Sequence, residues 1–116
     1  MHLNVEISAI AESIREAARP DRDKSIPSEQ LYGPIIRAMA RLADKLMRLN
    51  MIGKSERTMR LIQNLRAGIY QDSVHPRLIS CYAEATIAEL SWIASEIRTR
   101  EEAMSPTLGG AELAIG

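Results

Sequence analysis

The chain has few aromatic residues and little cysteine. Phenylalanine is absent, and one tryptophan and three tyrosines are the aromatic residues of all 116 positions. A core built from this composition must be filled by isoleucine, leucine, methionine and alanine. The one cysteine, Cys81, cannot form an internal disulfide, which favours a reducing compartment, the cytoplasm.

Sequence motifs for the common catalytic and metal-binding chemistries are missing. Neither GxxxxGK[ST] nor GxGxxG occurs, which argues against nucleotide hydrolysis. His2, His75 and Cys81 stand in no metal-ligand spacing, so we expect no metal and no cofactor. The one nucleophile with a histidine nearby is Cys81, and its apolar neighbours indicate an inert buried thiol. We expect no enzyme; a thiol-dependent enzyme at Cys81 is the alternative.

Long hydrophobic runs and a net charge are also missing. No uncharged apolar run approaches the roughly 18 residues that span a bilayer, and the first residues lack the pattern of a signal peptide. Fifteen basic residues balance fifteen acidic ones, so no overall field attracts the protein to a polyanion or to a membrane. We therefore expect a cytoplasmic protein without membrane contact that recognises its partners locally.

Apolar residues recur at alternating steps of four and three in four segments, which is the spacing of one helix face. Pro34 is expected at the first position of the second helix, and Ser55 is expected to be the N-cap of the third. The pattern predicts an all-α fold, a small antiparallel bundle of about four helices with a long C-terminal helix. It forms a single domain over 1–104, followed by a flexible tail over 105–116. The predicted helices cover about 3–18, 34–50, 55–69 and 76–104, with a polar connection at 19–27 and a joint at 50–54.

The long C-terminal helix carries two apolar strips. One contains Ile79 and Leu90, at the spacing of a core face. The second surrounds a tryptophan with small residues, and its burial at roughly 25 cal/mol per Å² favours a homodimer. In the alternative, the other three helices cover both strips. The second strip consists of Cys81, Ala85, Ala88, Trp92 and Ser95.

Charge is segregated along the chain. Residues 32–70 carry eight basic and two acidic side chains, net +6, whereas residues 1–31 and 71–116 carry −2 and −4. Four of the basic residues fall on the side of the second helix opposite its apolar stripe: Arg37, Arg41, Lys45 and Arg48. They either form a solvated face paired with neighbouring acids or dock an acidic partner or a phosphate backbone.

The basic stretch contains LADKL at 42–46 and SERTMRLIQNLRAGI at 55–69. The Ser-x-x-Thr start, the apolar positions Ile62 and Leu65 and the Gly-Ile exit resemble the two helices of a winged helix-turn-helix DNA-binding domain. The turn is longer than that family's, and a long helix rather than a β-hairpin is expected after Gly68. The resemblance implies that the DNA groove is contacted by Lys54, Glu56, Arg57, Arg60 and Gln63.

These observations favour a small helical regulator, adaptor or inhibitor that covers a surface of a protein partner. The alternative is a DNA-binding transcriptional regulator with a helix-turn-helix-like segment at 42–69. Methionines in the same stretch, Met39, Met47, Met51 and Met59, suit an adaptable contact. The candidate contacts for a partner or nucleic acid are Arg37, Arg41, Lys45, Arg48, Lys54, Arg57, Arg60 and Gln63.

Overall fold

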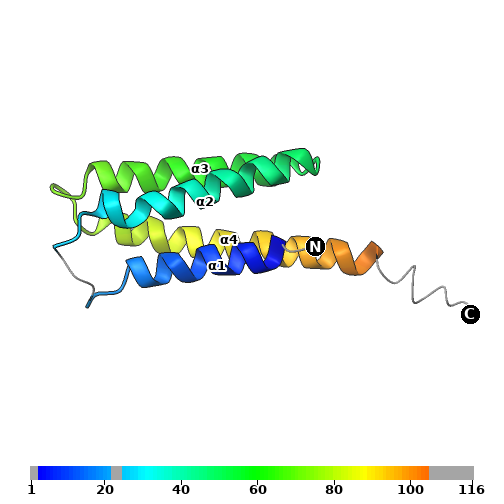
Figure 1. Ribbon diagram of the computed structural model, residues 1–116, viewed down its shortest axis with the longest axis horizontal. Helices are drawn as coiled ribbons and strands as arrows, with labels where there is room; N and C mark the ends of the chain where they lie inside the picture. Colours follow the sequence, from blue (N-terminus) through cyan, green and yellow to red (C-terminus); the bar gives the residue numbers. More distant parts are fainter. Residues whose placement is uncertain (1–2, 22–24, 105–116) are drawn as a thin grey trace, which may run out of the picture.

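The computed structural model describes residues 3–21 and 25–104, and the predicted tail at 105–116 lies outside them. Within the described residues the chain is entirely helical and has no strand (Figure 1). The all-α prediction is confirmed. The helices are α1 (Leu3–Ala17), α2 (Ser28–Arg48), α3 (Ile52–Tyr70) and α4 (Leu78–Met104).

Successive helices run in opposite directions and form a bundle. α1 packs against α2 and α4, and α3 packs against the same two helices. The α2–α3 pair therefore lies on one side of the molecule and the α1–α4 pair on the other (Figure 1). α4 is the longest helix, and its last turns extend beyond the rest of the bundle (Figure 1). The predicted antiparallel bundle with a long C-terminal helix is confirmed.

The core is made of aliphatic side chains, as the composition requires. The apolar stripe predicted for α1 is buried along its whole length, from Leu3 to Ala17. Met39, Leu42 and Leu46 of α2 are completely buried between the two helix pairs. Tyr32 is the largest buried side chain among the described residues.

The start of α2 differs from the prediction. The helix begins at Ser28, and Pro34 lies inside it rather than at its first position. Ser28 Oγ donates a hydrogen bond of 2.6 Å to Asp72 Oδ2 in the α3–α4 connection, and Tyr32 is buried. These tertiary contacts hold the first turns in place although proline removes one backbone donor from the helix. Pro27, whose backbone is extended, directly precedes the helix.

The joint between α2 and α3 is also shorter than predicted. Asn50 adopts a left-handed backbone conformation with φ of 63°, and the Met51 N–H donates to the Leu46 carbonyl at 2.8 Å. This pair of features is a Schellman ending for α2. Gly53 lies inside α3, and Ser55 is not an N-cap, because its buried hydroxyl donates to the Ala43 carbonyl of α2 at 2.7 Å.

Candidate interaction surface

The basic residues predicted for α2 do not all behave alike. Arg37, Arg41 and Arg48 lie on the exposed side of the helix, opposite its buried stripe. Arg48 forms an ion pair of 2.6 Å with Asp44 one turn earlier. Lys45 turns toward α1, where its Nζ donates to Glu6 Oε1 at 2.8 Å. The predicted basic face of α2 is therefore present, with one member used to join α2 to α1.

Two basic residues of α3 are used at the contact with α4. Arg57 Nη1 donates to Glu89 Oε2 at 2.6 Å, and its guanidinium carbon lies 4.2 Å from the centre of the Trp92 ring. Lys54 Nζ lies 5.8 Å from the same ring. Cations at these distances are attracted to the negative face of the indole. Lys54 and Arg57 thus face α4, where they stabilise the packing of α3.

Four arginines of α2 and α3 remain without such partners. Arg37, Arg41, Arg60 and Arg66 are exposed, and none forms an ion pair with a residue that the structure describes. Gln63 is exposed in the same stretch of α3. The positive charge that faces solvent is therefore spread over both helices of the α2–α3 pair.

A cavity of about 390 Å³ lies between α2 and α3 near the start of α2. Ile36 and Ile69 supply apolar surface from the two helices, and Tyr70 at the end of α3 is 88% exposed. Arg37 and Arg66 approach the cavity from opposite sides. The complete lining is Glu29, Gly33, Ile36, Arg37, Arg66, Ile69 and Tyr70.

Exposed apolar side chains continue along the same pair of helices toward the α2–α3 joint. Met47, Ile52 and Met59 are 46%, 47% and 45% exposed. Met47 follows Ile36 by three turns of α2, and Met59 precedes Arg66 by two turns of α3, so they share the side on which the cavity opens. We call this surface the α2–α3 groove: it consists of the cavity at Gly33 and Tyr70 and the exposed apolar side chains that follow it to Met47 and Ile52.

Sequence reasoning missed several members of this groove. Arg66 lies within the basic stretch, but neither it nor Ile36, Ile69 or Tyr70 is among the candidate contacts that the sequence predicts. The sequence does contain information that could have identified them. Apolar residues occur beside each buried stripe, at positions that face the neighbouring helix when two helices form a hairpin. Of the four methionines proposed for an adaptable contact, Met39 is fully buried, whereas Met47 and Met59 are exposed.

The geometry of α2 and α3 differs from that of a helix-turn-helix. Helices of a DNA-binding helix-turn-helix cross at about 90–120°, whereas α2 and α3 lie antiparallel, side by side (Figure 1). Gly68, placed by the resemblance at the exit of a recognition helix, is inside α3 against α4. No strand that could form a wing occurs in the residues described.

The second apolar strip of α4 is uncovered. Cys81, Ala85 and Ala88 are exposed, and Trp92 is 41% exposed despite its contact with Arg57. The other three helices therefore do not cover both strips, and the predicted homodimer through this strip stays a prediction. The expectation that Cys81 is buried is wrong, because it lies nearly opposite Ile79 and Ala83 on the helix.

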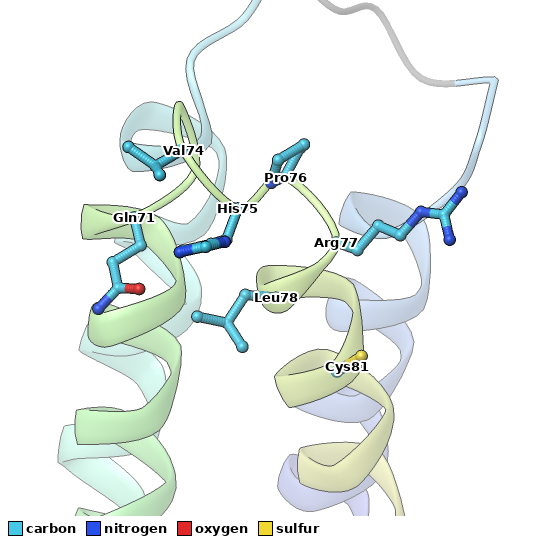
Figure 2. Close-up of a pocket in the computed structure, with 7 residues that line it drawn as sticks. All are labelled: Gln71, Val74, His75, Pro76, Arg77, Leu78 and Cys81. Atoms are coloured by element: carbon cyan, nitrogen blue, oxygen red, sulfur yellow. The ribbon is translucent and has the colours of Figure 1, made fainter.

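An open cavity of about 650 Å³ at the α3–α4 connection contains both Cys81 and His75 in its lining. Figure 2 shows the His75 imidazole pointing toward Gln71 and away from the Cys81 sulfur. No hydrogen bond joins the two side chains in the described part of the chain. A nucleophilic thiol requires a base within hydrogen-bond reach, and this arrangement does not supply one.

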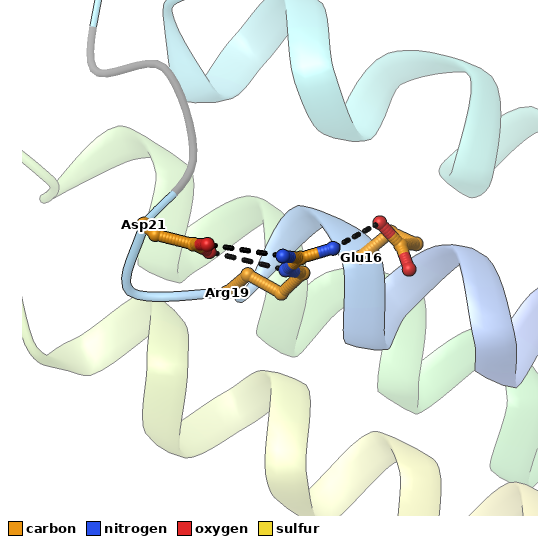
Figure 3. Close-up of polar contacts among 3 residues, drawn as sticks. All are labelled: Glu16, Arg19 and Asp21. Atoms are coloured by element: carbon orange, nitrogen blue, oxygen red, sulfur yellow. Dashed lines mark hydrogen bonds and ion pairs between the residues drawn. The ribbon is translucent and has the colours of Figure 1, made fainter.

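A cluster of charged residues at the end of α1 is formed by neighbours in the sequence and lies apart from the α2–α3 groove. Arg19 donates to both carboxylate oxygens of Asp21, at 3.1 and 3.0 Å, and to Glu16 at 3.3 Å (Figure 3). These hydrogen bonds and the positive charge of Arg19 lower the pKa of Asp21 below its usual value. The cluster lies on the surface, at the connection that leaves α1.

The described residues contain neither a cluster of metal ligands nor a helix that could span a membrane. No three histidine, cysteine, aspartate or glutamate side chains among them converge as metal ligands. None of the four helices combines the length and the apolar character that crossing a bilayer requires, over the range described. Comparison of the chain with protein-family models, with curated proteins and with solved structures gave no match.

Proposed function

We propose that the protein is a small cytoplasmic helical regulator, adaptor or inhibitor that binds a protein partner through the outer surface of α2 and α3, without catalysis. The observation that carries the proposal is the exposure of Arg37 and Arg66, neither of which forms an ion pair with a described residue, beside exposed apolar side chains on that surface. Guanidinium groups are weakly hydrated and form forked hydrogen bonds with carboxylates. Arginine, methionine and aromatic residues are also the types enriched in protein interfaces.

The mixture of charge and apolar area favours a protein over DNA. Interfaces with DNA are strongly polar and positively charged throughout, whereas Met47, Met59 and Tyr70 here expose apolar surface between the arginines. The antiparallel helices also offer no single protruding helix for the major groove. DNA binding by a transcriptional regulator remains the competing function, and it shares the same arginines.

The test compares two double charge reversals of equal size. Arg37→Glu with Arg66→Glu changes the α2–α3 groove, and Arg77→Glu with Arg98→Glu changes exposed residues beside and within α4. Each immobilised protein is used to capture partners from a cell lysate. The proposal predicts a stoichiometric protein partner that the wild type and the α4 variant retain and the groove variant loses.

Two results would overturn it. If both variants capture the partner equally, the partner binds another surface of the protein. If no protein is captured at a stoichiometric level, the proposed protein partner does not exist. Titration with duplex DNA at low salt distinguishes the competing function. A complex that weakens steeply with salt and is lost in the groove variant would assign the arginines to phosphates instead.

A further inference from the structure

We propose that the α2–α3 groove binds an acidic amphipathic helix that lies along its length. This inference rests on the proposed function and specifies the chemistry and the shape of the partner. Four features carry it: the length of the groove, its apolar floor, the arginines on its two sides, and the lack of an available sheet edge.

The length of the groove matches a helix of ordinary size. Gly33 at one end and Met47 at the other are both in α2, so they are separated by about 21 Å at 1.5 Å per residue. A partner helix of roughly four turns spans this distance. Its apolar residues at steps of three and four would contact Ile36, Met47 and Met59. Flexible methionines adapt their shape to such residues better than branched side chains do.

Gly33 makes the end of the groove accessible. A methyl group added at this position would come within 4 Å of the Arg37 guanidinium, at 3.6 Å, and of no backbone or core side chain of another described helix. The cavity of about 390 Å³ begins there. A large apolar side chain of the partner can therefore enter between Ile36 and Ile69. This point is the deepest contact that we expect.

Charge selects an acidic partner. Arg37 belongs to α2 and Arg66 to α3, so carboxylates on both edges of a bound helix would each meet a guanidinium. Arg60 lies about 120° around α3 from Arg66, so it adds positive charge on the solvent side of the helix and not at the groove. Glu29 is the acidic residue of the cavity lining, and Asp44 is already paired with Arg48. A basic helix would place its charges against these arginines and be repelled.

A helix fits better than an extended segment. An extended peptide usually binds by adding a strand to a sheet edge, and no strand exists in the described residues. Backbone donors in α2 and α3 are used within the helices, so recognition must come from side chains. A groove between two antiparallel helices then accepts a third helix through its i, i+3, i+4 and i+7 positions.

The experiment uses three fluorescent peptides of 18 residues with blocked ends and the full-length protein. The first places leucine and methionine on one helical face and glutamate on both edges of that face. The second has the same composition in scrambled order, and the third replaces each glutamate by lysine. Fluorescence anisotropy should show binding of the first peptide at least ten-fold tighter than binding of the other two.

Three protein variants locate the peptide. Arg37→Glu with Arg66→Glu should weaken binding at least ten-fold, and Arg77→Glu with Arg98→Glu should leave it within two-fold. Gly33→Leu should also weaken binding, because its side chain occupies the cavity while its Cβ fits without a backbone clash. Circular dichroism and thermal unfolding test whether each variant is folded; the four substituted arginines are exposed, and Gly33 is half-buried.

The inference is overturned if the acidic amphipathic peptide binds no tighter than its scrambled form, or if the groove variants bind it as the wild type does. Equal binding of the lysine peptide would also overturn it. If the peptide fails while capture from lysate still depends on Arg37 and Arg66, the proposed function stands and only the helical, acidic partner is rejected. Sedimentation of the protein alone tests for a second copy as the occupant. A wild type that sediments as a dimer, with the Arg37→Glu and Arg66→Glu variant as a monomer, would place a second copy in the groove and overturn the inference of a separate partner.

Discussion

The two sides of α3 place the same kind of residue in opposite situations. Toward α4, Arg57 is paired with Glu89 and covers Trp92, and Lys54 faces the same ring. Toward the α2–α3 groove, Arg66 meets no carboxylate that forms an ion pair with it among the described residues, and Arg37 of α2 is in the same position. The difference lies in what the neighbouring helix supplies: α4 provides an acid and an aromatic ring in contact with Arg57, whereas α2 provides Arg37 and an acid, Glu29, that forms no ion pair with Arg66.

This comparison distinguishes basic residues that stabilise the fold from basic residues that are available to bind a partner. An arginine that is already paired and stacked must give up those contacts before it can bind anything else. An unpaired arginine can bind a carboxylate without losing an internal partner. The net charge of +6 over residues 32–70 therefore overstates the charge that is available to a partner.

The largest effect on stability should come from adding a methyl group where α3 packs closely against α4. A Cβ at Gly68 would lie 2.9 Å from the Ile79 Cα, so Gly68→Ala must push the two helices apart. We expect the free energy of unfolding to fall by about 1–2 kcal/mol, the cost of overpacking less the gain in helix propensity.

Gly53→Ala is the matched control in the same helix. No atom lies within 4 Å of its added Cβ, so this variant should gain about 0.5–1 kcal/mol. Urea or thermal unfolding of both variants measures the difference. Equal effects of the two substitutions would contradict the close contact of α3 and α4 at Gly68.

The second test reverses two cations of α3, one that is ion-paired and one that forms no ion pair with a described residue. Arg57→Glu places a carboxylate beside Glu89 and removes the contact with Trp92, so it should destabilise the fold by about 1 kcal/mol. Arg60→Glu should change stability by less than about 0.5 kcal/mol, because Arg60 is exposed and has no ion pair with a described residue. Thermal unfolding at low and high salt gives both values. A larger loss for Arg60→Glu would show that the two arginines have been assigned to the wrong roles.

A third test concerns the buried side of the α2–α3 pair. Ser55→Ala removes the hydroxyl that donates to the Ala43 carbonyl, and it should cost about 0.5–1.5 kcal/mol. Ser95→Ala changes an exposed serine of α4 and should be close to neutral. The midpoints of denaturant unfolding, compared at unchanged m-value, measure the change in the free energy of unfolding. Partner binding should survive Ser55→Ala, because Ser55 faces the interior.

The smallest effect concerns the surface pair of Arg19 and Asp21. The lowered pKa of Asp21 means that its contribution to stability is complete above the ordinary aspartate value of about 4 and is lost as pH falls through the lower folded-state value. Arg19→Ala should raise the pKa of Asp21 toward the ordinary value. An NMR titration of the carboxyl carbon measures it, and an unchanged pKa would mean that the ion pair is not formed in solution.

Apolar spacing was sufficient to predict the four helices and most of the core, because each buried stripe is a property of one helix. The errors have another origin. Ser28 is held by Asp72 and Ser55 by Ala43, partners that local patterns cannot identify. The exposure of Cys81, in contrast, follows from the spacing of Ile79 and Ala83, so this error was avoidable.

The basic stretch was visible in the sequence, but its division into paired and unpaired residues was not. Lys45 pairs with Glu6, 39 residues away, and Arg57 pairs with Glu89, 32 residues away. Such pairs depend on which helices are neighbours and on their relative position along the bundle. Charge counts therefore located the candidate surface, and only the packing of α1 and α4 showed which arginines belong to it.

The left-handed backbone at Asn50 also affects the order of folding. It allows α2 to reverse into α3 within a few residues, so the hairpin closes at a small cost in chain entropy. Every residue of the groove belongs to that hairpin. Because local contacts form fastest, we expect the two halves of the groove to meet early, before α1 and the long α4 complete the bundle. Substitutions at the α2–α3 contact should then slow refolding, and those on α1 should mainly speed unfolding.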